Sequence, residues 1–104
     1  MFIQTQQTPN PNSLKFLIEK KVSLVGPIEF KNKNETSVSL IKNILSVNGV
    51  TGIFLSDDYL SVNKDTNSEW DDLKHIIISY INDFYEQGNE CIISEKRSDN
   101  SEEL

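Results

Sequence analysis

The chain has 104 residues, a formal net charge of −6, one cysteine and one histidine. An acidic domain repels phosphate backbones, so this composition argues against nucleic-acid binding. A structural zinc site or an iron–sulfur cluster needs about four ligands, which one cysteine and one histidine cannot supply. No apolar run approaches the roughly 20 residues that span a bilayer. We therefore expect one small, soluble domain that holds no metal and does not enter a membrane.

The beginning of the chain predicts two strands joined by a stiff turn. Residues 1–7 include β-favouring side chains, and the run Thr8-Pro9-Asn10-Pro11-Asn12 then breaks the strand. Proline lacks a backbone donor and asparagine tolerates turn conformations. Apolar residues at every second position from 14 to 18 predict the next strand. Residues 19–34 carry a weaker signal, and here Ile28 and Phe30 favour a short extended piece at most.

The remaining elements follow in chain order. Apolar residues at helical spacing between 38 and 45 predict a helix of about ten residues. Residues 50–64 predict a second hairpin that turns at Asp57-Asp58. A long helix then begins after Ser68, whose hydroxyl is expected to cap it, and ends at Gly88. Its apolar stripe, which we expect to face the sheet, comprises Trp70, Leu73, Ile77, Tyr80, Ile81 and Phe84.

The element order β-β-α-β-β-α predicts an α+β fold: a four-stranded, mostly antiparallel sheet with two helices on one face. We expect residues 1–88 to form the domain. Residues 89–104, which become strongly polar after Cys91-Ile92-Ile93, are expected to be a linker or tail.

No residue pattern indicates catalysis. Asp57 and Asp58 are neighbours on a predicted turn and do not converge on a substrate, and Cys91 has no base nearby in the sequence. Phosphate-binding and nucleophile motifs are absent. The residues by themselves therefore predict a binding or interaction module and no enzyme.

Several stretches resemble the N-terminal domain of the Nfu (NifU-like) family, whose members are iron–sulfur cluster scaffold or carrier proteins. The resemblance covers roughly residues 1–87 and is most specific in the Thr-Pro-Asn-Pro-Asn run with the Leu-Lys-Phe strand after it. The matching stretches are 1–5, Thr8 to Phe16, Gly26 and Phe30, Gly49 to Phe54, Asp58 to Lys64, and Trp70 with Leu73-Lys74. Where family members often have Ser-Pro at the start of the first helix, this chain has Val38-Ser39.

The resemblance implies a non-catalytic module for partner or client recognition, with the cluster ligands in a C-terminal Cys-x-x-Cys domain outside this chain. It implies no cofactor here and an iron–sulfur cluster only in the full-length protein. The implied partners are iron–sulfur client or assembly proteins, together with the tethered cluster domain. The candidate partner-binding residues are Pro9, Asn10, Pro11, Asn12 and Ser13, because the prolines stiffen the loop and the asparagines offer donors and acceptors.

The sequence is also compatible with other roles for the loop and for the domain. The prolines also fit a purely structural role, in which they only shape the hairpin connection. The whole domain fits a stand-alone protein-interaction domain unrelated to cluster transfer. The absence of a transit-peptide pattern at the N-terminus favours the bacterial cytoplasm, with the mitochondrial matrix as the second expectation.

Overall fold

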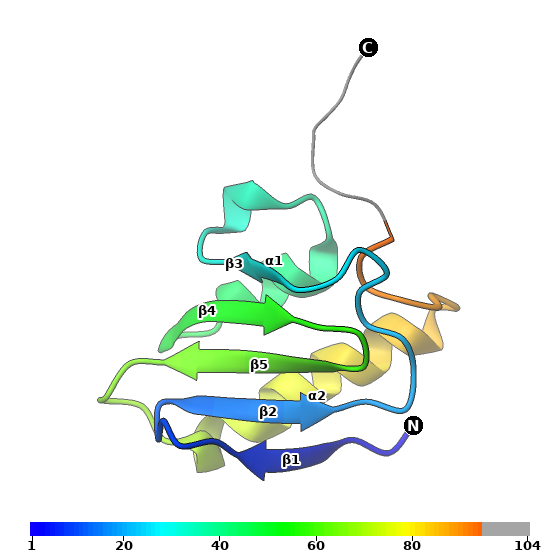
Figure 1. Cartoon of the computed structure of the whole chain (residues 1–104). Helices are drawn as coiled ribbons and strands as arrows, with labels where there is room; N and C mark the ends of the chain where they lie inside the picture. The colour runs from blue at the N-terminus through cyan, green and yellow to red at the C-terminus, as the bar shows by residue number, and fades with distance from the viewer. Residues whose placement is uncertain (95–104) are drawn as a thin grey trace.

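The computed structural model describes residues 1–94 as one antiparallel sheet with two helices packed on one face (Figure 1). The strand order is β1-β2-β5-β4-β3. The elements are β1 (Gln4–Gln7), β2 (Ser13–Leu17), β3 (Ile28–Phe30), a 3-10 helix η1 (Lys33–Glu35), α1 (Ser39–Leu45), β4 (Val50–Leu55), β5 (Tyr59–Lys64) and α2 (Trp70–Glu86). The predicted α+β class and the two helices are therefore correct.

The prediction of four strands is wrong, because β3 adds a fifth. It pairs antiparallel with β4 in the register Ile28↔Leu55 and Phe30↔Ile53, and the Phe30 side chain is fully buried. Three residues contain a single alternation, which is too short to show a strand period in the sequence. The strand is stabilised by its backbone pairing with β4 and by burial of the Phe30 side chain in the core.

The core lies between the sheet and α2. Leu14 and Phe16 of β2 face the helices together with Leu60 and Val62 of β5, their cross-strand partners. The buried residues of α2 are Leu73, Ile77, Ile81 and Tyr85, whereas Trp70, Tyr80 and Phe84 are only partly buried. The predicted stripe is thus rotated toward Tyr85, and Trp70 lies at the margin of the core.

The start of α2 also differs from the expectation. Glu69 occupies the N-cap position without a side-chain hydrogen bond, and the Ser68 hydroxyl donates instead to Asp65 Oδ1 at 2.8 Å. Gly49, at φ 100°, lies directly against Ser68, where a Cβ atom would collide with the serine side chain. A glycine is therefore required where the chain enters β4.

The packed structure continues past residue 88, where the sequence predicts the domain to end. Ile92 and Ile93 are buried, and both donate their N–H groups to the carbonyl of Val22 at 2.9 and 3.0 Å. The Leu24 N–H in turn donates to the carbonyl of Ile93 at 2.8 Å. We call residues 91–93 the C-terminal strap. The rest of the predicted tail, residues 95–104, lies outside the described residues.

No helix within residues 1–94 is long and apolar enough to cross a membrane.

Candidate partner-binding site

The loop between β1 and β2 is held in shape by its own polar groups. The Asn10 side chain accepts the Asn12 N–H at 2.9 Å, and Thr8 Oγ1 accepts the Asn10 N–H at 3.1 Å. The Ser13 N–H donates to the carbonyl of Asn10 at 3.0 Å. Two asparagine- and threonine-based turns therefore follow each other, one over residues 8–10 and one over residues 10–12, each with a proline at its centre. The loop accordingly has few alternative conformations.

Two further contacts tie this loop to distant elements. Trp70, the first residue of α2, donates its indole N–H to the carbonyl of Pro11 at 3.0 Å. Lys64, at the end of β5, donates through its backbone N–H to the Asn12 carbonyl and through Nζ to Asn12 Oδ1, at 2.8 and 3.1 Å. The Lys64 ammonium also lies 5.7 Å from the centre of the Trp70 ring, within cation–π range.

A pocket of about 580 Å³ opens between this loop, β1 and the first turns of α2. Four of the five predicted residues, Pro9, Asn10, Pro11 and Ser13, line it. Asn12 does not, because its side chain is bound to Lys64. The partner-binding role of all five residues stays a prediction, but the structure gives four of them a shared concave surface.

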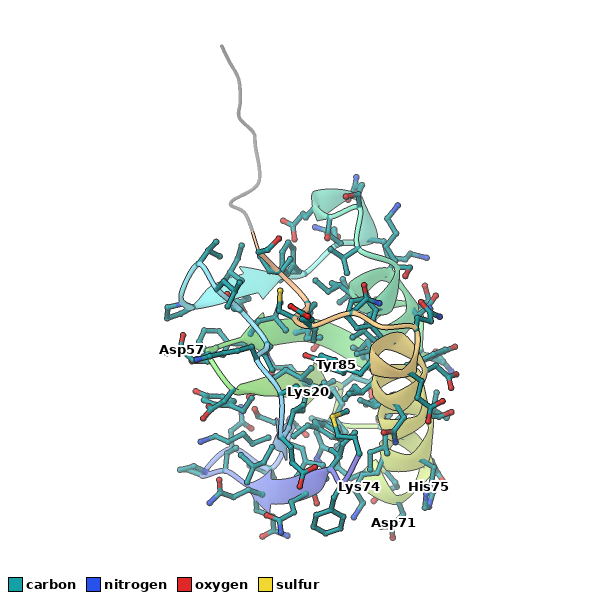
Figure 2. All side chains as sticks on the ribbon, turned by 90° about the vertical axis from the view of Figure 1, so that its right-hand side faces the viewer. Lys20, Asp57, Asp71, Lys74, His75 and Tyr85 are labelled. Carbon is teal, nitrogen blue, oxygen red and sulfur yellow. The ribbon has the colours of Figure 1, made fainter. Side chains whose placement is uncertain are left out.

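The other walls of the pocket come from β1 and α2, which the residue patterns did not indicate. Thr5 and Gln7 of β1 line one side, and Trp70, Asp71 and Lys74 of α2 line another. Figure 2 shows Asp71 and Lys74 at the N-terminal end of α2, with Lys74 on the side of the helix toward β1 and His75 on the outer side. The signal for Lys74 was its position next to Leu73 and one turn before the buried Ile77, on the flank of the apolar stripe.

The other polar candidates form no second site. The carbonyls of Asp57 and Asp58 accept the N–H groups of Val22 and Ile18, so this turn supports the neighbouring chain segment. His75 is exposed. Among residues 1–94, no group of three or more His, Cys, Asp or Glu side chains is arranged to hold a metal ion.

Tyr85 is the residue whose titration is most strongly perturbed. Its hydroxyl donates to the carbonyl of Lys21, across a gap of 64 residues in the sequence. Burial, and to a smaller extent the neighbouring Cys91, raises the pKa of Tyr85 well above its ordinary value. The neutral phenol is therefore the form that fits this position, which is structural and lies at the far end of α2 from the pocket (Figure 2).

Comparison with known proteins gives a family for this fold. The family model described as the N-terminal part of the scaffold protein Nfu/NifU matches residues 3–88. The chain belongs to this family. The resemblance drawn from residues 1–87 is confirmed.

Individual relatives agree with the Nfu/NifU family model. The mitochondrial NifU-like protein 4 of Arabidopsis thaliana is 43% identical over 89 residues, which make up 85% of this chain and 31% of that protein. The mitochondrial NFU1 iron-sulfur cluster scaffold homolog of Homo sapiens is 36% identical over 100 residues, 94% of this chain and 39% of that protein. The chain thus spans about a third of the length of these curated relatives.

A solved structure shows the same fold. The solution structure of a NifU-like protein from Saccharomyces cerevisiae superposes with a TM-score of 0.80 at 31% identity, and the match covers 91% of this chain and 86% of that one.

The residues of this Nfu N-terminal domain do not fit an iron–sulfur cluster. Such clusters are held by about four thiolates. The chain has one cysteine, Cys91, and it is half-buried beside Tyr85 in the C-terminal strap.

Proposed function

We propose that this chain is a non-catalytic recognition domain of an iron–sulfur cluster scaffold protein, and that it docks a client or assembly protein through the pocket beside residues 8–13. The observation that carries the proposal is that pocket: four of the residues expected to bind a partner line one cavity, in a loop fixed by hydrogen bonds. A preorganised loop loses little conformational entropy when a partner docks, which favours affinity.

The family supports the cluster-related part of the proposal. The human relative is named an iron-sulfur cluster scaffold homolog, and this chain matches 39% of it. Cluster ligands would then lie in another part of the full-length protein, and this domain would hold the partner near them. A flexible tether of short length gives an effective concentration in the millimolar range, so weak docking is sufficient.

The names of the relatives also bear on location. The Arabidopsis and human proteins are both named as mitochondrial. They favour a mitochondrial location for this chain over the bacterial cytoplasm that its N-terminus suggests.

The test is a cluster-transfer assay with the full-length protein and an apo client enzyme. Deleting residues 1–94 should slow transfer. Asn10→Ala removes the acceptor for the Asn12 N–H and should slow transfer about fivefold, the equivalent of one lost neutral hydrogen bond. Asn10→Asp keeps an acceptor at the same place and should transfer at nearly the normal rate, as should His75→Ala on the exposed side of α2.

The outcomes distinguish between the recognition role and the face that carries it, provided that the variants keep their normal melting temperature. If the deletion leaves transfer unchanged, the recognition role is wrong and a stand-alone interaction domain becomes the better interpretation. If the deletion slows transfer but Asn10→Ala does not, the domain recognises its partner through another face.

A further inference from the structure

The outer edge of β1 carries backbone groups that β2 does not use. Lys64 donates to the Asn12 carbonyl and Ile18 donates to the Asp58 carbonyl, so even-numbered residues of β2 direct their N–H and C=O groups toward β5. Odd-numbered residues such as Lys15 therefore point toward β1, where the partner of Lys15 is Gln6. It follows that Gln4 and Gln6 bond to β2, whereas Thr5 and Gln7 direct their backbone groups outward.

This edge lacks the usual protection against pairing. Natural edge strands carry lysine, proline or inward-pointing charges that prevent a further strand from adding. The opposite edge, β3, follows this rule, because Pro27 and Lys31 flank it and Glu29 lies within it. β1 consists of uncharged Gln-Thr-Gln-Gln, exposed along its whole length. It is short, but its outward donors and acceptors are open to an extended segment.

The side chains of the same two residues line the pocket. Thr5 pairs with Phe16 and Gln7 with Leu14, so Thr5 and Gln7 lie on the helix-covered face of the sheet. A strand added beside β1 would place every second side chain on that face, next to Thr5 and Gln7 and under the first turns of α2. The pocket is therefore where a side chain of the added strand would go.

Lys74 indicates which side chain fits. Three lysines of residues 1–94 are half-buried: Lys15, Lys64 and Lys74. Lys15 lies over the Tyr59 ring at 4.4 Å, and Lys64 has two hydrogen bonds and the Trp70 ring. Lys74 has no hydrogen bond, ion pair or ring contact with any of residues 1–94, although it lines the pocket. A half-buried lysine whose ammonium has no partner among residues 1–94 favours an anionic ligand.

We propose that β1 pairs with an extended segment of a partner protein and that an aspartate or glutamate of this segment binds Lys74 inside the pocket. The inference rests on the proposed recognition function and names its chemistry. Asp71 also lines the pocket but is exposed, where water screens its repulsion of the incoming carboxylate. A second copy of this chain fits less well, because its own β1 has no carboxylate to offer Lys74.

The experiment is selection of random heptapeptides displayed on phage against the immobilised chain at physiological salt. We expect enriched peptides with β-favouring residues and an aspartate or glutamate at one fixed position. Lys74→Met should weaken binding of a selected peptide roughly tenfold, the scale of one lost hydrogen bond to a charged group. Repeating the selection on Lys74→Glu should enrich lysine or arginine at that same position.

A backbone variant tests the strand pairing itself. Thr5→Pro removes one outward N–H group without removing a bond between β1 and β2, and should abolish peptide binding. Thr5→Val, which keeps the N–H group and a similar shape, is the matched comparison and should bind far more tightly than Thr5→Pro. The melting temperatures of both variants show whether the domain stays folded.

Three results would overturn the inference: no enriched peptide, an enriched family indifferent to Lys74→Glu and Thr5→Pro, or a wild-type dimer in sedimentation that Thr5→Pro converts to a monomer. The last result would assign the edge to a second copy. A deletion of residues 1–94 that slows cluster transfer, combined with either of the first two results, would leave the recognition function standing and reject only this mode of binding.

Discussion

Two aromatic side chains of α2 connect the helix to segments far away in the sequence. Trp70 at its beginning binds the carbonyl of Pro11, and Tyr85 near its end binds the carbonyl of Lys21. Each ring packs against the core and presents its polar end to a backbone group that regular secondary structure leaves free. One helix thus fixes both the loop at the candidate site and the chain segment that follows β2.

The burial of Tyr85 predicts how the free energy of unfolding depends on pH. Its pKa is raised in the folded state, so above the unfolded value near 10 the unfolded chain has lost a proton that the folded chain keeps. The free energy of unfolding should therefore fall as pH rises through 10 and beyond. Tyr85→Phe removes this contribution and the bond to Lys21, at a cost of about 1 kcal/mol near pH 7.

Denaturant titrations at several pH values between 7 and 11 measure the difference. The loss of stability between pH 9 and 11 should be smaller in Tyr85→Phe than in the wild type. Tyr80→Phe is the matched control, because Tyr80 lies on the same helix and is only partly buried. Its profile should follow the wild type. Equal profiles for Tyr85→Phe and the wild type would show that the buried phenol does not titrate with unfolding.

At the scale of elements, the C-terminal strap joins the end of the described chain to the segment that follows β2. It lies along Val22 to Leu24, which in turn bond to the turn between β4 and β5 through the carbonyls of Ser56 and Asp57. Three segments from different parts of the sequence are thus stacked at the end of α2. The strap contributes two buried isoleucines to the core although it belongs to no helix or strand of the sheet.

Ile93→Ala should therefore destabilise the domain by about 2–4 kcal/mol, the usual range for a truncated core isoleucine. The exposed neighbour Ser94→Ala should change the free energy of unfolding by less than about 0.5 kcal/mol. Urea titration of both variants measures the difference. A loss below about 1 kcal/mol for Ile93→Ala would mean that residues after 88 act as the linker that the sequence suggests.

The elements that the sequence predicts well are those with several repeats of one period. The strands around Phe16 and Val62 and the helix containing Leu73 and Ile77 each repeat their pattern often enough to be recognised. β3 and the strap are different, because two or three apolar residues have no period and gain their structure only from tertiary contacts. The same reason explains the pocket: loop residues marked by Pro9 and Pro11 were predictable, whereas its walls on β1 and α2 depend on which elements pack together.

At the scale of the whole molecule, the candidate site and the end of the described chain lie at opposite ends of α2 (Figures 1 and 2). A helix of 17 residues is about 25 Å long. A partner held at the pocket would therefore lie about that far from residue 94. In a full-length scaffold protein, a connecting segment of ordinary length can bridge this distance, since an extended chain spans roughly 3.3 Å per residue.

An iron–sulfur cluster should not assemble on this chain alone. After anaerobic incubation with iron, sulfide and a thiol reductant, this chain should show no stable iron–sulfur absorbance at stoichiometric yield. The reason is that a cluster needs about four thiolate ligands and the chain has one cysteine. Cys91 is moreover half-buried in the strap. The Cys91→Ser variant is the control, and both proteins should give the same featureless spectrum. A cluster present at one per two chains and lost in Cys91→Ser would contradict this, and would show that two domains bridge a cluster with added thiols.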